Sequence, residues 1–384
     1  MSLVTSGLDS RICAIGDWLL NSGIQDERGA FYAWLDHEDS VSSYLYSEIT
    51  GYAITTLCFL YTLTNDVLYL QRAESAARWI IDAALHSSGG VLTRLYLTEE
   101  VEHYSFSRGY IYAFDCAMVA FAMLKLYKLT AQKCYLDVSR RIVDFLARRM
   151  LRADGLCYPI FDARSGQVCE VKDTWSRQAG SFHCKLTLPL CELAELEGNR
   201  HYLRLAQNII EASMQHFYKD RFITNVSDQS SHFHPYCYTL EGLVFYSYKN
   251  NTDRYRDAIR QGFDWMVQFQ DENGGLPTSV FSPHNIKTPY QRCDIQAQSL
   301  RLYFLIGAVE GENRVNNLNL DRLLQRLLSF QDVSSIRGGG FFFGEDKDGS
   351  YKKHSNSWCT MFGLQALYLA AGKLGPQMIL EYLV

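Results

Sequence analysis

Residues 110–150, YIYAFDCAMVAFAMLKLYKLTAQKCYLDVSRRIVDFLARRM, carry the pattern that decides the fold. The segment 110–129 is apolar on nearly every side, and a helix of that kind must be covered by protein on all its faces. The segment 135–150 is amphipathic, because apolar residues such as Leu136 and Ile142 recur at helical spacing while arginines occupy the other faces. A buried helix beside a half-buried helix is the unit of a two-layer, all-α structure.

The rest of the chain repeats this pair of helices. Six mostly apolar segments alternate with six amphipathic segments, and neighbouring apolar segments begin 53 to 68 residues apart. Self-similarity at a long period indicates a repeat architecture. The residues near the starts of the apolar segments are Glu48, Asp115, His183, Tyr236, Asp294 and Asn356.

The ends of the chain indicate how these repeats are arranged. An open solenoid needs terminal repeats with a polar outer face. The last apolar segment, 354–371, is as apolar as those in the middle of the chain, which argues against an open end. Closing the six hairpins into a ring removes the difficulty. We therefore expect an all-α (α/α)6 toroid with six inner and six outer helices, forming a single domain over residues 1–384.

The connections between the helices differ in length on the two sides of the predicted ring. Turns from an apolar segment to the next amphipathic one are short, whereas the returning loops are long and rich in Gly and aromatic residues. All long loops, some of them β-hairpins, are therefore expected on one face, at the N-termini of the inner helices. Functional residues are commonly found on loops held by a rigid scaffold.

Composition and charge exclude several classes of function. The formal net charge is -5, which argues against binding to nucleic acid or to an anionic membrane surface. No apolar run reaches the length of a membrane span, and the start, MSLVTSGLDSR, lacks the pattern of a signal peptide. The 11 Cys contain no CxxC pair, which is typical of reduced thiols, so we predict a cytoplasmic protein. No nucleotide-binding glycine motif is present, and we expect neither a cofactor nor a metal ion.

Short Gly-aromatic or Gly-apolar elements recur in the long loops. They are Gly29–Tyr32, Gly90–Leu92, Gly155–Tyr158, Gly275–Pro277 and Gly340–Phe342. With the six hairpins, they make the whole chain resemble the six-hairpin glycosidase superfamily. That group includes many glycoside hydrolases, unsaturated uronyl hydrolases and, with a related barrel, N-acylglucosamine 2-epimerases. The resemblance implies a saccharide substrate bound in a cleft on the long-loop face. Toroids of this kind also serve terpene cyclases, prenyltransferase β-subunits and lanthionine cyclases, so architecture alone does not assign the chemistry.

Four residues at the starts of inner helices are the candidates for catalysis. Glycoside hydrolysis generally uses two carboxyl groups that flank the scissile bond. Glu48, Asp115 and Asp294 could supply them, with Asp115 paired to Asp294 or to Glu48. His183 could act as an acid or base near neutral pH. The alternative interpretation is that these residues only cap helices, a role in which Asp and Glu are common.

Candidates for substrate binding surround the same face. Aromatic planes pack against the C–H faces of sugar rings, and arginines hold carboxylate or phosphate groups. The predicted substrate-binding residues are Tyr52, Arg108, Trp175, His234, Tyr236, Tyr238, Arg292, His354 and Trp358. Lys185 also lies near the predicted mouth, and charge balance for nearby acids is the alternative role for such cations.

These observations favour a glycoside hydrolase that uses paired carboxylates, on a substrate that could be an acidic or amino sugar. Two alternatives stay open. One is a sugar epimerase that uses histidine as acid and base, and the other is a non-catalytic carbohydrate-binding toroid. The sequence predicts no particular oligomeric state.

Overall fold

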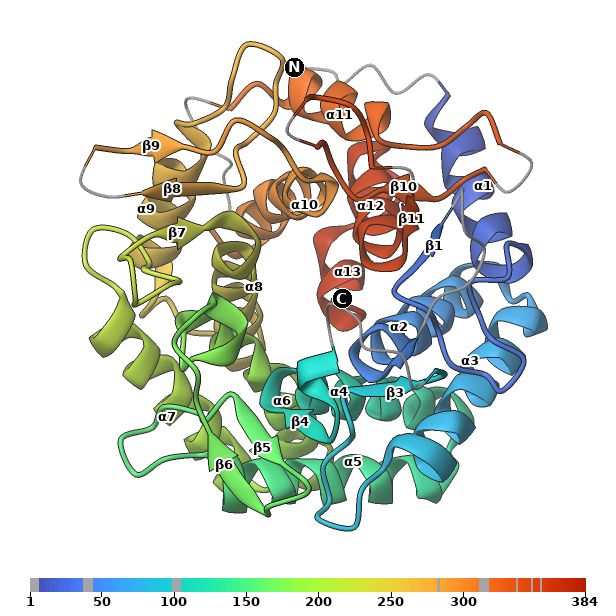
Figure 1. Cartoon of the computed structure of the whole chain (residues 1–384), viewed down its shortest axis with the longest axis vertical. Coiled ribbons are helices and arrows are strands. Elements are labelled where there is room, and N and C mark those ends of the chain that lie inside the picture. Colours follow the sequence, from blue (N-terminus) through green and yellow to red (C-terminus); the bar gives the residue numbers. More distant parts are fainter. Residues whose placement is uncertain are drawn as a thin grey trace.

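The computed structural model describes residues 7–36, 44–98, 105–281, 284–310, 318–335, 338–346, 348–352 and 354–384. Its helices form a closed ring of two layers (Figure 1). The outer layer consists of α1 (Leu8–Asn21), α3 (Val67–Trp79), α5 (Lys133–Phe145), α7 (Arg200–Phe217), α9 (Arg256–Val267) and α11 (Leu320–Ser329). The inner layer consists of α2 (Ser47–Thr64), α4 (Ala113–Thr130), α6 (Thr187–Glu197), α8 (Phe233–Asn250), α10 (Cys293–Glu310) and α12 (Ser357–Ala370). The predicted (α/α)6 toroid is confirmed.

The two layers bury different amounts of surface, as their sequences predict. Each inner helix contacts the next inner helix, and α12 contacts α2 to complete the circle. In α4 every residue from Ala113 to Leu126 is buried. An outer helix buries one stripe only; in α11 this stripe is Leu323, Leu324 and Leu327. The all-round apolar character of the inner helices is therefore a consequence of having neighbours on every side.

Short strands connect successive hairpins on one face of the ring. They are β1 (Trp34–Asp36), β2 (Tyr44–Tyr46), β3 (Arg94–Tyr96), β4 (Tyr110–Tyr112), β5 (Ile160–Asp162), β6 (Gln167–Cys169), β7 (Ser231–His232), β8 (Ser279–Phe281), β9 (Ile286–Lys287), β10 (Phe341–Phe342) and β11 (His354–Asn356). A strand that leads into an inner helix pairs antiparallel with the strand after the next outer helix, as in β2–β3, β4–β5 and β7–β8. The same rule joins β11 to β1, with Trp34 opposite Asn356, and so closes the ring between its two ends.

The third inner helix is irregular in its first turns. A proline such as Pro189 within the apolar segment 181–196 would kink a continuous α-helix. Instead, Ser181–Leu186 form the 3-10 helix η5, and Pro189 lies in the first turn of α6. The missing N–H of proline is tolerated in a first turn, where it would have no helical partner. Further short segments are η1 (Ile80–Ala84) and η3 (Leu146–Met150), which extend α3 and α5, together with η2 (Ser105–Ser107) and η4 (Trp175–Arg177).

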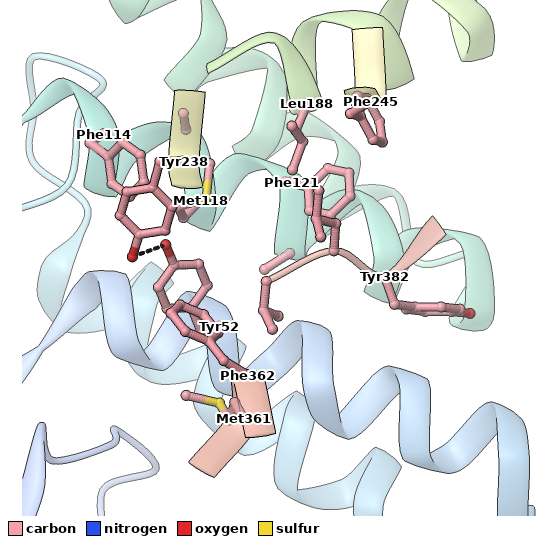
Figure 2. Packing of buried hydrophobic residues seen from close by; sticks show 14 of the residues in the cluster. Tyr52, Phe114, Met118, Phe121, Leu188, Tyr238, Phe245, Met361, Phe362 and Tyr382 are labelled. Carbon is pink, nitrogen blue, oxygen red and sulfur yellow. Dashed lines mark hydrogen bonds between the residues drawn. The ribbon is translucent and has the colours of Figure 1, made fainter. Parts of the chain in front are cut away.

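The C-terminal segment lies at the centre of the ring in Figure 1, where α13 (Pro376–Glu381) follows α12. Tyr382 is buried there, and its hydroxyl lies 2.9 Å from that of Thr62 in α2. Figure 2 shows the aromatic core nearby, including Tyr52, Tyr238 and Phe362. No helix in the described part of the chain combines the length and apolarity required to traverse a bilayer. All 11 Cys lie in described residues and are free thiols.

Candidate functional site

A cavity of about 420 Å³ opens among the loops and first turns at the N-terminal ends of the inner helices. Aromatic side chains make up much of its wall: Trp34, Tyr44, Tyr46, Phe106, Tyr112, Phe114, Trp175, Phe182, Tyr238, Phe343 and Trp358. The polar lining consists of Glu48, Arg94, Asp115, Ser176, His234, Arg292, Lys352, His354 and Asn356. A concave site with many apolar rings and a few convergent polar groups is typical of small-molecule binding.

Glu48 and Asp115 reach this cavity from neighbouring inner helices. Helices α2 and α4 approach closely at Gly51, where an added Cβ atom would lie 3.1 Å from the backbone nitrogen of Val119. Glu48 precedes Gly51 by three residues, and Asp115 precedes Val119 by four. The close contact therefore places both carboxyl groups at nearly the same level, one turn above it, where both line the cavity.

The surroundings of the two carboxyl groups give them different proton affinities. Burial raises the pKa of Asp115 well above its usual range, and the negative charge of Glu48 raises it further. Burial also raises the pKa of Glu48, but hydrogen bonding from Tyr46 and the positive charges of Arg94 and Lys185 oppose that effect. The Oδ2 atom of Asp115 is buried and has no hydrogen-bond partner among the described residues. Of the two carboxyl groups, Asp115 therefore holds its proton more tightly.

Asp294 has a different environment from these two residues. Its side chain is fully buried, and it does not belong to the described lining of the cavity. It accepts hydrogen bonds from Arg292 Nε at 3.1 Å and from Trp358 Nε1 at 3.0 Å, and its Oδ2 lies 3.3 Å from His234 Nδ1. Burial raises its pKa, but the positive charge of Arg292, the nearby His234 ring and the hydrogen bonds from Arg292 and Trp358 outweigh that effect and lower it. Contrary to expectation, Asp294 lies behind the cavity wall and holds three side chains that line it.

His234 is held in one orientation by this carboxylate. Its Nδ1 lies 2.8 Å from Gln298 Oε1 as well as 3.3 Å from Asp294. Burial lowers the pKa of His234 to about 4, so the ring is neutral near pH 7. Because Nδ1 faces two acceptors, it carries the hydrogen, and Nε2 keeps a free lone pair. His354, which also lines the cavity, stacks on Trp34 with ring centroids 5.2 Å apart.

A buried ion pair lies next to the cavity. Lys185 Nζ lies 2.7 Å from Glu241 Oε2, and both side chains are fully buried. The other oxygen of Glu241 accepts from Arg301. The Lys185 ammonium group lies 4.3 Å from the centre of the Tyr238 ring, which forms part of the cavity lining. Lys185 therefore lies beside the cavity but within the helical core, and it is not part of the described lining.

Eight of the thirteen predicted site residues line the cavity: Glu48, Asp115, Trp175, His234, Tyr238, Arg292, His354 and Trp358. Asp294 and four others lie elsewhere. Tyr52 is buried and donates a hydrogen bond to the Tyr238 hydroxyl at 3.0 Å (Figure 2). His183 is buried against Phe182, and burial lowers its pKa to about 3.

Two further predicted residues, Tyr236 and Arg108, do not belong to the described lining of the cavity. Tyr236 is buried toward the outer layer, where its ring stacks on Trp265 of α9 at 5.5 Å and its hydroxyl donates to the Gly262 carbonyl oxygen. Arg108 donates to the Thr98 carbonyl oxygen at 2.9 Å and lies over the ring of Tyr96. The structure therefore does not bring these two residues to the lining of the cavity.

Several lining residues are absent from the predicted site. Arg94 lies directly opposite Tyr46 in the β2–β3 ladder, and Tyr112 and Asn356 each end the strand that leads into an inner helix. Lys352 belongs to the loop before β11. These residues share one feature that could have identified them: they lie in or beside the short strand that precedes an inner helix, as Arg94, Tyr112 and Asn356 do. In the sequence, these strands cannot be distinguished from irregular loop.

Among the residues that the structure describes, no group of three or more His, Cys, Asp or Glu side chains is arranged to hold a metal ion. The described cysteines beside the inner-helix starts, such as Cys116 and Cys237, are buried, and burial raises the pKa of their thiols.

Comparison with solved structures shows the same architecture in several sugar-processing proteins. A D-mannose isomerase superposes with a TM-score of 0.78 at 13% identity, over 97% of this chain and 100% of that one. The cellobiose 2-epimerase of Spirochaeta thermophila DSM 6192 gives 0.75 at 13% identity, over 95% and 98% of the two chains. The unsaturated glucuronyl hydrolase of Bacillus sp. GL1 gives 0.64 at 14% identity, over 92% and 95%. At these identities the likeness establishes the fold.

A comparison with curated proteins gives no match for this chain. The family model of glycosyl hydrolase family 47 matches residues 40–246, which is more than half of the 384 residues. The matched segment contains the hairpins that carry Glu48 and Asp115. The chain therefore belongs to glycosyl hydrolase family 47, within the six-hairpin glycosidase superfamily of carbohydrate-active enzymes.

Proposed function

We propose that this chain is a glycoside hydrolase in which Asp115 is the general acid and Glu48 is its ionised partner. One observation carries the proposal: both carboxyl groups line the same aromatic cavity, and their surroundings separate their proton affinities. Two neighbouring carboxyl groups with different pKa values are the usual arrangement for acid and base roles in glycoside hydrolysis.

The proposed reaction begins with proton donation. The buried carboxyl group of Asp115 protonates the glycosidic oxygen as the bond to the anomeric carbon breaks. The carboxylate of Glu48 stabilises the positive charge that develops on the sugar ring, and it either activates a water molecule or bonds to the anomeric carbon. Arg94 and Lys185 favour the ionised form of Glu48 that this role requires.

The remaining lining residues hold the sugar in place. Trp175, Tyr238 and Trp358 offer ring faces to the C–H groups of a saccharide. Asp294 acts as a positioning residue, because its carboxylate fixes Arg292, His234 and Trp358 at once.

The proposal is tested by measuring hydrolysis of a panel of 4-nitrophenyl glycosides and of oligosaccharides with free reducing ends. Asp115→Asn and Glu48→Gln are each expected to reduce kcat by roughly 100- to 10,000-fold, the usual contribution of a general acid or base. Asp264→Asn, on outer helix α9, is the matched control and should keep full activity. Hydrolysis that persists in both cavity variants would contradict the proposal. Saccharide binding without turnover by the unmodified protein would instead favour a carbohydrate-binding role.

A second candidate function is a sugar epimerase or isomerase. It is favoured by the two histidines in the cavity, since His234 is neutral with a free Nε2 lone pair and His354 lines the same space. Such a reaction removes a proton next to the sugar carbonyl group. Incubation of aldoses in D2O, followed by NMR, would show deuterium at carbon 2 if this reaction occurs, and His234→Asn would abolish the exchange. Hydrolysis involves no such exchange, so the two functions are separable.

A further inference from the structure

The lining of the cavity carries more positive than negative charge. Its cationic side chains are Arg94, Arg292 and Lys352, whereas Glu48 and Asp115 are its carboxyl groups. Burial and the negative charge of Glu48 raise the pKa of Asp115, which favours its neutral form. The chain as a whole has a formal net charge of -5, so this local excess is opposite to the average of the protein.

Two of the cations lie on one wall of the cavity. Arg292 and Lys352 both contact the ring of Phe343, at 4.6 Å and 5.2 Å from its centre. Arg292 directs Nε and Nη2 to Asp294, which leaves Nη1 for another acceptor. Lys352 is 38% exposed and lies 3.8 Å from Asp346, at the outer limit of an ion pair.

Asn356 adds an unused donor to the same wall. Its Oδ1 accepts from the backbone nitrogen of Cys359 at 3.0 Å and so caps helix α12. Its Nδ2 is fully buried, lines the cavity and has no hydrogen-bond partner among the described residues. A buried donor without a partner is costly, so a bound ligand that offers an oxygen acceptor there is favoured.

The ring arrangement places this wall away from the proposed acid. Helix α4, which carries Asp115, contacts α2 and α6, whereas α10 contacts α8 and α12. Two inner helices therefore separate α4 from α10 in either direction around the ring, and Arg292 lies on the far side of the cavity from Asp115. A substrate group held by Arg292 would leave the glycosidic oxygen free to face Asp115.

We propose that Arg292, Lys352 and Asn356 form a subsite for the carboxylate of a uronic acid residue in the substrate. A carboxylate has two oxygens that can accept from a guanidinium, an ammonium and an amide group at once, and contacts with charged partners are the stronger hydrogen bonds. The subsite names the substrate class of the proposed hydrolase and rests on that function for its biological meaning. Its occupancy by a free sugar acid does not depend on turnover.

The test is a binding titration of the full-length protein with D-glucuronate and D-glucose, followed by NMR. Neither sugar contains a glycosidic bond, so failure of the hydrolase proposal does not affect the measurement. We expect D-glucuronate to bind about 10-fold more tightly than D-glucose, which corresponds to about 1.4 kcal/mol. The preference should shrink when the salt concentration rises from about 50 to about 500 mM, because ions screen the charges. Equal affinity for the two sugars would overturn the proposal.

Two substitutions locate the subsite. Asn356→Asp keeps the oxygen that caps α12 but replaces the amide donor with a negative charge. It should therefore weaken the binding of D-glucuronate by about 10-fold or more and leave the affinity for D-glucose unchanged. Lys352→Met should weaken the binding of D-glucuronate but not that of D-glucose. Lys287→Met is the matched control, because Lys287 also lies over a phenylalanine ring, at 5.6 Å from Phe269, but is outside the described lining of the cavity. Equal effects on both sugars in the two cavity variants would contradict the assignment.

A third sugar tests whether the subsite prefers a carboxylate to another anionic group. Glucose 6-sulfate presents a sulfate ester at the position where D-glucuronate has its carboxylate. Weaker binding of the sulfate than of the carboxylate supports a uronic acid, and stronger binding overturns that choice.

Discussion

Lys185 and Glu241 form a 2.7 Å ion pair between fully buried side chains in the core of the ring. Glu241 also accepts from Arg301, so one carboxylate serves two cations. An excess of positive charge therefore remains close to Glu48, and it opposes the effect of burial on that carboxyl group. Burial lowers the pKa of Lys185 itself to about 8, while Glu241 favours its charged form.

Replacing Lys185 should therefore change the pH dependence of the reaction. In Lys185→Met, the pKa of Glu48 should rise because one of the charges that favours its ionised form is gone. The proposed reaction requires ionised Glu48, so the acid limb of the plot of kcat/KM against pH should move to higher pH. The measurement is this profile for the wild type and the variant. Lys125→Met is the control, because Lys125 is also buried but pairs with Glu192 and Glu381. An equal shift in both variants would indicate a general structural effect.

Asp115 should make the stability of the protein depend on pH in a defined direction. Its folded-state pKa is raised by burial and by Glu48, so the folded chain binds this proton more tightly than the unfolded chain does. The resulting contribution to stability is complete below the unfolded pKa of about 3.9 and is lost as pH rises through the folded pKa. An amide at this position stays neutral at every pH. The Tm of Asp115→Asn should therefore exceed that of the wild type by a margin that grows between pH 4 and pH 8.

The control for this experiment is Asp137→Asn, whose carboxylate is 66% exposed and pairs with Arg140 on the surface of α5. The difference in Tm between this variant and the wild type should not grow with pH. A constant or shrinking difference for Asp115→Asn would mean that Asp115 is ionised in the folded protein, and it could not then be the general acid near neutral pH.

The fold could be predicted from the sequence because the alternation of helix types is itself a consequence of the ring. An inner helix such as α4 is enclosed on all sides and reads as apolar throughout, whereas an outer helix such as α11 has a single apolar stripe. The same property limits the prediction of the site. A helix that is apolar all round does not reveal which residues face the axis. Tyr236 and Tyr238 illustrate this, since the first packs on α9 and the second lines the cavity.

Asp294 and Arg94 show two further limits. The sequence places Asp294 correctly at an inner-helix start, but its partners Arg292, His234 and Trp358 come from three elements that only the folded ring brings together. Arg94 reaches the cavity because β3 pairs with β2, and strands of three residues are too short to leave a clear alternating pattern. Long, periodic helices were thus predictable, and contacts made through short strands were not.

The distance between the two carboxyl groups should depend on the size of residue 51. A side chain at Gly51 would meet the backbone and side chain of Val119 at 3.1 to 3.2 Å. Gly51→Val is therefore expected to push α2 away from α4 and to cost about 1–3 kcal/mol of stability through overpacking. A displacement of about 1 Å at the carboxyl pair should reduce kcat by up to roughly 100-fold. The checks are chemical denaturation and the hydrolysis assay.

Gly262→Val gives the matched comparison, because a Cβ atom added at Gly262 would also be crowded, at 3.2 Å from Leu240, but Gly262 lies in outer helix α9. It should lose stability without a comparable loss of kcat. If both variants lose activity in proportion to stability, the Gly51 contact does not set the geometry of the carboxyl pair.

A buried ion cluster lies at the end of the inner helices opposite the cavity. Glu192 is fully buried, and its oxygens lie 3.1 Å from Lys125 Nζ, 2.5 Å from Lys128 Nζ and 2.9 Å from Lys249 Nζ. Glu381, at the end of α13, pairs with Lys125 at 2.8 Å and with Lys128 at 2.9 Å. Glu192 therefore joins α4, α6 and α8, and the same lysines hold the C-terminal helix in place.

Removing the Glu192 charge should destabilise the whole ring, because it leaves buried lysines without their partner. Glu192→Gln is expected to cost about 3–5 kcal/mol, as for other broken buried pairs. Burial raises the pKa of Glu192, but the three lysines outweigh it and lower the pKa to about 2. The stabilisation is present above the unfolded pKa of about 4.3 and is lost as pH falls toward 2, so wild type and variant should converge in acid. Urea denaturation at pH 7 and pH 3 measures this.

Glu197→Gln breaks a more exposed pair with Arg140 and should cost at most about 1 kcal/mol at either pH. A similar loss in the two variants at pH 7 would show that the Glu192 cluster contributes no more than an ordinary surface pair.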